Sequence, residues 1–184
     1  RDSGRSASVL SNLKNIHTQA EIYHIESGTY EGLCDDTQIA EMVTSLDASS
    51  DGAACWVATD TYTGAAYQTE LAPIDFGIAA TVDGTYYGAD PFGVFTFDDT
   101  DTGGSQSWNT AISTCTDGKR LSGASVLRAI YTIDSTTPTG FTADSYWSSF
   151  ESPSSPSSAY RSDLTNGGVG RASKGGGRYV RCVQ

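Results

Sequence analysis

The sequence lacks any apolar run that could cross a membrane, since no stretch approaches the roughly 18–20 apolar residues of a transmembrane helix. Basic residues are also scarce: 11 Lys and Arg stand against 22 Asp and Glu, which gives a formal net charge of −11. Nucleic acids and anionic membrane surfaces bind basic protein surfaces. The charge therefore argues against both as partners.

The sequence also lacks the patterns of common metal and catalytic sites. His17 and His24, its two histidines, lie seven positions apart on one predicted helix, too far to share a metal ion without other ligands. The absence of a C-x-x-C pair disfavours zinc. No Gly-x-Ser-x-Gly turn, Cys–His pair or phosphate-binding loop occurs. We therefore predict a protein that is not an enzyme and that has no metal or cofactor.

One acidic segment, residues 98–103, contains the Asp-x-Asp-x-Gly pattern of oxygen ligands that suits hard cations. No bidentate Glu follows at the spacing that a calcium loop requires. We therefore expect a solvated acidic loop rather than a calcium site.

Four cysteines are present, Cys34, Cys55, Cys115 and Cys182, and four cysteines can pair in three ways. We favour Cys34–Cys55 and Cys115–Cys182, because each pair then falls within one of two predicted domains. Disulfides form in oxidising compartments, so we expect an extracellular protein, at the cell surface or beyond. The abundance of Gly, Ser, Thr and Tyr is typical of extracellular, turn-rich β-structure.

Residues 6–26 form the clearest predicted helix. Apolar residues recur at alternating spacings of four and three and line one face, namely Val9, Leu13, Ile16, Ala20 and Tyr23. Gly28 ends the helix as a C-cap. A helix with one apolar stripe must pack on something, and we expect it to pack on strands that precede Pro73.

The front of the chain resembles a bacterial type IV pilin or pseudopilin over about the first 70 residues. The resemblance rests on the opening Arg-Asp-Ser-Gly-Arg, on Ala20-Glu21-Ile22-Tyr23, and on Ser27-Gly28-Thr29-Tyr30 followed by Leu33-Cys34. It implies other pilin subunits as partners. The apolar half-helix that anchors such subunits is absent, and the chain does not begin with Met, so we expect a trimmed start. The protein would meet a membrane only through that missing helix.

Pro73 marks the predicted boundary between domains 1–72 and 73–184. Short elements flank it, namely a helix near 39–46 and strands at 54–58, 65–71, 77–82 and 93–97. Two helices follow, capped by Ser107 and Ser122. Their predicted inward residues are Trp108, Ala111, Ile112 and Cys115 in the first helix, and Val126, Leu127 and Ile130 in the second. A final strand covers 179–183.

Residues 74–184 resemble the bacterial branch of the C-type lectin fold, shared with formylglycine-generating enzymes and the variable proteins of diversity-generating retroelements. The motifs, in order, are Ser107-Trp108, Cys115, Gly118-Lys119-Arg120-Leu121, Gly140-Phe141, Tyr146-Trp147-Ser148-Ser149 and Tyr179-Val180-Arg181-Cys182. The chain has Leu121-Ser122 where that branch usually has Leu-Pro. The sugar-binding signals Glu-Pro-Asn, Gln-Pro-Asp and Trp-Asn-Asp are absent. We thus predict an α+β protein: a pilin-like helix with a small sheet, followed by a C-type lectin-like fold.

The Ser/Gly-rich tract 150–177 lacks a sustained apolar period, so it cannot be core along its length. A plain flexible loop is one interpretation. The resemblance to retroelement variable proteins implies another, a surface whose Ser, Gly, Tyr, Phe and Arg positions are rewritten by mutagenesis. These residues also suit a binding surface. We expect Ala159, Leu164 and Val169 to point inward.

The residues predicted to form this variable surface are Phe150, Ser152, Ser155, Tyr160, Ser162, Thr165, Gly168, Gly170, Arg171, Ser173 and Gly175. The leading hypothesis is a ligand-binding protein displayed on a pilus or cell surface, with an unknown protein or surface ligand. The alternative is a structural minor pilin or secretion pseudopilin without a specific ligand. An enzyme related to the formylglycine-generating proteins is disfavoured, because Cys115 and Cys182 occupy positions that look structural.

Overall fold

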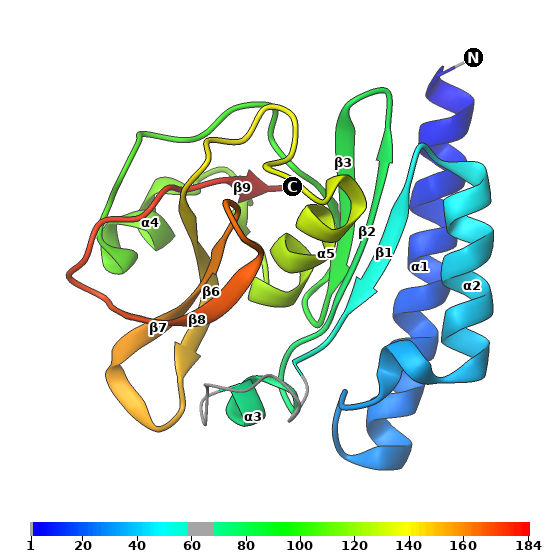
Figure 1. The fold of residues 1–184 in the computed structure, drawn as a ribbon, viewed down its shortest axis with the longest axis horizontal. Coiled ribbons are helices and arrows are strands. Elements are labelled where there is room, and N and C mark those ends of the chain that lie inside the picture. The colour runs from blue at the N-terminus through cyan, green and yellow to red at the C-terminus, as the bar shows by residue number, and fades with distance from the viewer. Residues whose placement is uncertain (1, 59–67) are drawn as a thin grey trace.

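The computed structural model describes residues 2–58 and 68–184 (Figure 1). The first part of the chain comprises α1 (Asp2–Ser27), the 3-10 turn η1 (Leu33–Asp35), α2 (Thr37–Ser49), β1 (Ala53–Trp56), α3 (Gln68–Leu71), β2 (Gly77–Val82), β3 (Thr85–Asp90) and β4 (Gly93–Thr96). The second comprises α4 (Trp108–Thr114), β5 (Arg120–Leu121), α5 (Ala124–Asp134), β6 (Ser145–Ser152), β7 (Ser155–Asp163), β8 (Gly168–Ser173) and β9 (Cys182–Val183). The fold class is α+β, as predicted.

The elements form layers (Figure 1). Helices α1 and α2 lie side by side against one face of an antiparallel sheet with strand order β1-β2-β3-β4. Helix α5 lies on the other side of that sheet and also contacts β7 of a second antiparallel sheet, ordered β6-β7-β8. A short pair, β5 with β9, closes the C-terminus. Helix α5 is therefore the element shared by both sheets.

The long N-terminal helix confirms the predicted stripe, since Val9, Leu13, Ile16 and Ala20 are all buried and Tyr23 is partly buried. Its predicted packing partner was wrong. Helix α1 packs against β2, β3 and β4, which all follow Pro73. Strand β1 alone precedes Pro73 among the strands of that sheet, so the helix must use later strands to cover its stripe.

The sheet joins the two predicted domains. β1 pairs with β2 in antiparallel register, from Ala53 opposite Ala80 to Trp56 opposite Gly77. One hydrophobic cluster likewise contains residues from α1 together with Tyr160 and Val169 of the second sheet. The division at residue 72 stays a prediction about how the chain is organised, but the two segments share a sheet and a core.

Several local predictions hold. The helix near 39–46 is α2, the run at 77–82 is β2, and the runs at 54–58 and 93–97 correspond to β1 and β4. Ser107 caps α4 by accepting a hydrogen bond from the Thr110 backbone N–H. Both predicted disulfides, Cys34–Cys55 and Cys115–Cys182, are present.

Other local predictions were wrong. Within the predicted strand 65–71, Gln68–Leu71 is helical, and residues 65–67 lie outside the described part of the chain. Strand β3 was not predicted, although it forms a hairpin with β2 across the Asp83-Gly84 turn. Ile112, expected to point inward, is 44% exposed, because α4 is a short helix with one covered face.

The second C-terminal helix is capped differently from the prediction. Gly123, not Ser122, is the N-cap of α5, and it makes no side-chain hydrogen bond. The cap comes instead from Asp75, whose Oδ2 accepts a 2.8 Å hydrogen bond from the Ser125 backbone N–H. Such an acceptor satisfies a free N–H of the first helical turn. A residue 50 positions away in sequence thus performs the capping.

The Asp75 carboxyl is fully buried, and burial raises its pKa to about 8, against the opposing hydrogen bonds from the α5 N-terminus. A carboxyl whose folded-state pKa is raised holds its proton when the unfolded chain has lost it. The free energy of unfolding therefore falls as the pH rises from 3.8 toward about 8.

We expect Asp75→Asn to flatten this pH dependence, because Asn keeps an acceptor oxygen but does not titrate. Chemical denaturation of both proteins across that pH range measures the effect. The stability advantage of the wild type over the variant should shrink steadily with increasing pH. Two stability curves that stay parallel would show that Asp75 does not titrate in this range.

The second prediction concerns α1. Leu13→Asp should lower the free energy of unfolding by at least about 2 kcal/mol, because it buries an unpaired charge beneath the helix. Thr18→Asp, at an exposed position of the same helix, is the control and should change stability by less than about 0.5 kcal/mol. Urea denaturation of the three proteins measures both. Equal stability of the two variants would mean that the stripe does not hold the helix on the sheet.

Candidate ligand-binding surface

The Ser/Gly-rich tract forms regular structure rather than a loop. Its residues make up the end of β6 and all of β7 and β8, and β7 pairs with β8 from Ser158 opposite Ser173 to Asp163 opposite Gly168. The expected inward residues Ala159, Leu164 and Val169 are 0%, 0% and 6% exposed. This part of the prediction is confirmed, and the plain-loop interpretation is wrong.

The strand register separates the two faces of the central strand, β7. Ala159 belongs to a cluster with Trp108 and Trp147, whereas Tyr160 belongs to the main core near α1 and β2. Side chains of neighbouring residues in a strand point to opposite faces. Since both faces are covered at this point, consecutive residues are buried.

Four residues predicted to be on the variable surface are therefore inside the protein. Ser152, Tyr160 and Ser162 are at most 2% exposed. The Ser162 hydroxyl donates to the Ala124 carbonyl at 2.7 Å, which ties β7 to the first turn of α5. Ser and Tyr can be buried when such partners satisfy their hydroxyls, and composition alone could not reveal those partners. Gly170 is also buried.

The other predicted surface residues are accessible. Thr165, Ser173 and Gly175 are exposed, and Phe150, Ser155, Gly168 and Arg171 are partly exposed. Most of them lie near strand ends or in turns, whereas Arg171 lies within β8 opposite Tyr160. The tract therefore combines a fixed interior with a rim of small and polar side chains.

Glu70 of α3 gathers the polar groups at one end of this sheet. Ser152 and Tyr160 both donate to its Oε2, at 3.1 and 3.2 Å, and the Arg171 guanidinium lies 3.9 Å away. Hydrogen bonds from Ser154, Ser152 and Tyr160, with the charge of Arg171, lower the pKa of Glu70. Sequence reasoning missed Glu70, because nothing in its local pattern points to strands some 80 residues later.

The C-terminal segment fixes the sheet from its other face. The Trp147 backbone N–H donates to the Tyr179 backbone carbonyl. The Trp147 indole N–H donates to the Gln106 carbonyl at 2.8 Å. The Trp108 indole N–H donates to the Ser148 carbonyl at 2.8 Å. These bonds and the disulfide from α4 to β9 hold the frame around the tract.

The acidic segment 98–103 is not simply solvated, which corrects our expectation. Arg181 is 4% exposed, and its Nη2 donates to Asp101 Oδ1 at 2.6 Å. Asp101 Oδ2 accepts from the Tyr146 hydroxyl at 2.7 Å, and burial together with this bond raises the pKa of Tyr146. Asp101 thus serves a buried ion pair, while Asp99 is exposed. Among the described residues no group of three or more His, Cys, Asp or Glu could hold a metal ion.

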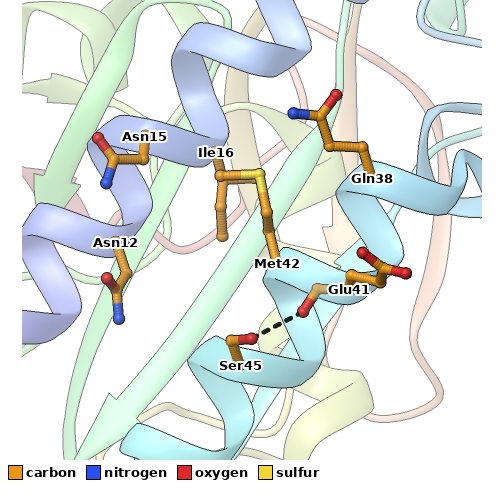
Figure 2. A pocket seen from close by; sticks show the side chains of 7 residues that line it. All are labelled: Asn12, Asn15, Ile16, Gln38, Glu41, Met42 and Ser45. Carbon is orange, nitrogen blue, oxygen red and sulfur yellow. Dashed lines mark hydrogen bonds between the residues drawn. The ribbon is translucent and has the colours of Figure 1, made fainter.

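A separate groove of about 260 Å³ lies between α1 and α2. Figure 2 shows its lining, which combines the amide side chains of Asn12, Asn15 and Gln38 with the apolar side chains of Ile16 and Met42. The lining residues are Asn12, Asn15, Ile16, Gln38, Glu41, Met42 and Ser45. Nothing in the sequence singled out this groove, because it forms only when the two helices pair.

No protein-family model matches the chain, and no curated protein matches it either. No helix in the described part of the chain has the length and apolar character to span a bilayer.

The third prediction compares a buried with an exposed residue of β7. Tyr160→Ala should lower the free energy of unfolding by about 3–5 kcal/mol, because it leaves a cavity in the main core. Ser157→Ala, an exposed position of the same strand, should change it by less than about 0.5 kcal/mol. Thermal and urea denaturation measure both variants. Similar stability in the two would mean that β7 is a peripheral element.

Proposed function

We propose that this protein is an extracellular ligand-binding protein in which a C-type-lectin-type scaffold presents a diversified surface on a pilin-like base. One observation carries the proposal: the tract has a buried, hydrogen-bonded interior and an accessible rim of small polar residues. Such an arrangement lets rim residues change without disturbing the core, which is what a rewritable binding surface requires.

The rest of the molecule supports the two-part description. A 26-residue helix lying along an antiparallel sheet is consistent with the pilin-like base. Two helices, a separate small sheet and a disulfide joining α4 to β9 are consistent with the lectin-type scaffold. Both disulfides fit an oxidising, extracellular environment.

The corrected binding surface is smaller than the sequence predicts. It omits the buried Ser152, Tyr160, Ser162 and Gly170, and it keeps the accessible residues of the set, namely Phe150, Ser155, Thr165, Gly168, Arg171, Ser173 and Gly175.

The alternative, a structural pilin subunit without a specific ligand, is favoured by one observation on α1. Ile22 and Ile25 are 41% and 80% exposed on the outer side of the helix, where subunits could pack. The two functions are compatible in one molecule, because α1 and the second sheet lie at opposite ends of the fold (Figure 1).

The fourth prediction tests diversification directly. Sequencing the gene from many cells of one source population should reveal amino-acid variation concentrated at the accessible tract positions. Codons for Ala159, Tyr160, Leu164 and Val169 should be constant, because these side chains are buried. A nearby near-repeat of the tract with adenines at the variable codons, next to a reverse-transcriptase gene, should accompany the pattern. Constant codons throughout, with no such repeat, would favour the structural alternative.

A further inference from the structure

An exposed aromatic ring stands beside the tract, on the β3–β4 turn. Phe92 is 58% exposed and is the aromatic member of the exposed large hydrophobic residues in the described chain. Its ring stacks on Phe150, with centroids 5.2 Å apart and planes inclined by 29°. Phe150 belongs to the predicted variable surface, so this contact places a residue from another part of the chain at the edge of that surface.

The turn that carries Phe92 is held rigidly. Asp90 is fully buried, and its Oδ1 accepts a 2.9 Å hydrogen bond from the Phe92 backbone N–H. Pro91, between them, has a fixed φ. The Arg120 guanidinium lies over the Phe92 ring, 5.1 Å from its centroid. The exposed ring therefore loses little conformational freedom when a ligand binds to it.

The Arg120 guanidinium has five N–H donors, and its hydrogen bonds to Asp90 and Leu121 use three of them. Its Nη1 and Nη2 donate to the two oxygens of Asp90 at 2.8 and 2.6 Å, which uses one fork of the guanidinium. Nη1 also donates to the Leu121 carbonyl. The hydrogen bonds that Arg120 makes within the described residues come from Nη1 and Nη2, and its side chain is 31% exposed. The Nε and Nη2 edge is thus a second fork with the geometry that a carboxylate matches.

We propose that Phe92 and Arg120, which lie beside the predicted variable position Phe150, form a fixed anchoring site for a peptide segment of a protein partner that carries an aromatic side chain next to a carboxylate. The aromatic side chain would pack against the exposed part of the Phe92 ring, and the carboxylate would accept from the second fork of Arg120. The proposal rests on the proposed function, because it assigns an anchor to the same binding face.

The charge of the protein limits which partners this anchoring site can bind. The net charge of −11 repels a strongly acidic partner at long range. Asp90 also neutralises Arg120, so attraction comes from directed hydrogen bonds rather than from a positive field. The site therefore suits a single carboxylate with an adjacent ring and does not suit a polyacidic stretch.

The test uses three blocked dipeptides as probes: Ac-Phe-Asp-NH2, Ac-Phe-Asn-NH2 and Ac-Ala-Asp-NH2. Titration into the isotopically labelled protein is followed by NMR at the Arg120 Nε–H and the Phe92 ring. We expect the Phe-Asp probe to bind with a dissociation constant on the order of 1 mM. The Asn and Ala probes should each bind roughly tenfold more weakly, because each lacks one of the two contacts.

Variants locate the site. Phe92→Ala, which removes an exposed ring, should weaken the Phe-Asp probe by roughly tenfold while the folded spectrum is retained. Arg120→Lys keeps the charge beside Asp90 but removes the fork, and should abolish the preference for Asp over Asn. Ile112→Ala, which removes an exposed apolar side chain on α4, is the matched control and should bind as the wild type does.

Equal binding of the Asp and Asn probes, or shifts that leave Phe92 and Arg120 unaffected, would overturn the anchoring site. So would the absence of any shift at millimolar probe concentrations. These outcomes are separate from the sequencing test, since diversified rim residues could bind ligands without this anchor. If the tract codons were constant but the Phe-Asp probe bound as expected, the anchoring site would stand and the diversification hypothesis would fail.

Discussion

Close packing of α5 against the four-stranded sheet is the constraint on which the rest of the fold depends. A Cβ atom on Gly77 would lie 2.1 Å from the Val126 backbone nitrogen, so only glycine allows this approach. One strand away, a Cβ on Gly88 would lie 2.8 Å from the Val126 side chain. The buried Asp75 then caps the helix at the same point. The start of α5 is thus fixed in position on β2.

The fixed helix positions the second sheet. The Ser162 hydroxyl donates to Ala124 in the first turn of α5, and Leu127 and Ile130 share a cluster with Leu164. Trp108 of α4 and the C-terminal residues Val180 and Cys182 cover the opposite face. A strand covered on both sides keeps its register, whatever side chains occupy its accessible ends. This separation of fixed interior from open rim supports the binding proposal.

Burial inside the tract also explains why residue type alone did not predict which tract residues are accessible to a ligand. Ser152 and Ser155 are chemically identical, but the first is buried beside Glu70 and the second is accessible. Tyr160 suits a binding surface by composition, yet it occupies the main core. Phe92 went unnoticed because it lies outside the tract, and its stacking on Phe150 requires β4 and β6 to be brought together.

Local periodicity and cysteine content determined a good deal by themselves. The spacing of Val9, Leu13, Ile16 and Ala20 predicted α1 and its buried face, because a helical stripe is encoded within a few turns. Ala159, Leu164 and Val169 were likewise identified as inward. Both disulfide pairings were correct, although the reason given for them assumed a boundary that one sheet crosses.

Only the tertiary structure decided which elements those faces meet. The partners of α1, the cap of α5 and the burial of Tyr160 all depend on residues tens of positions away in the chain. An amphipathic pattern predicts that one face of a helix must be covered, but it does not identify the element that covers that face. Polar residues such as Ser162 and Asp75 carry even less local information, because their burial is acceptable only once a distant hydrogen-bond partner is in place.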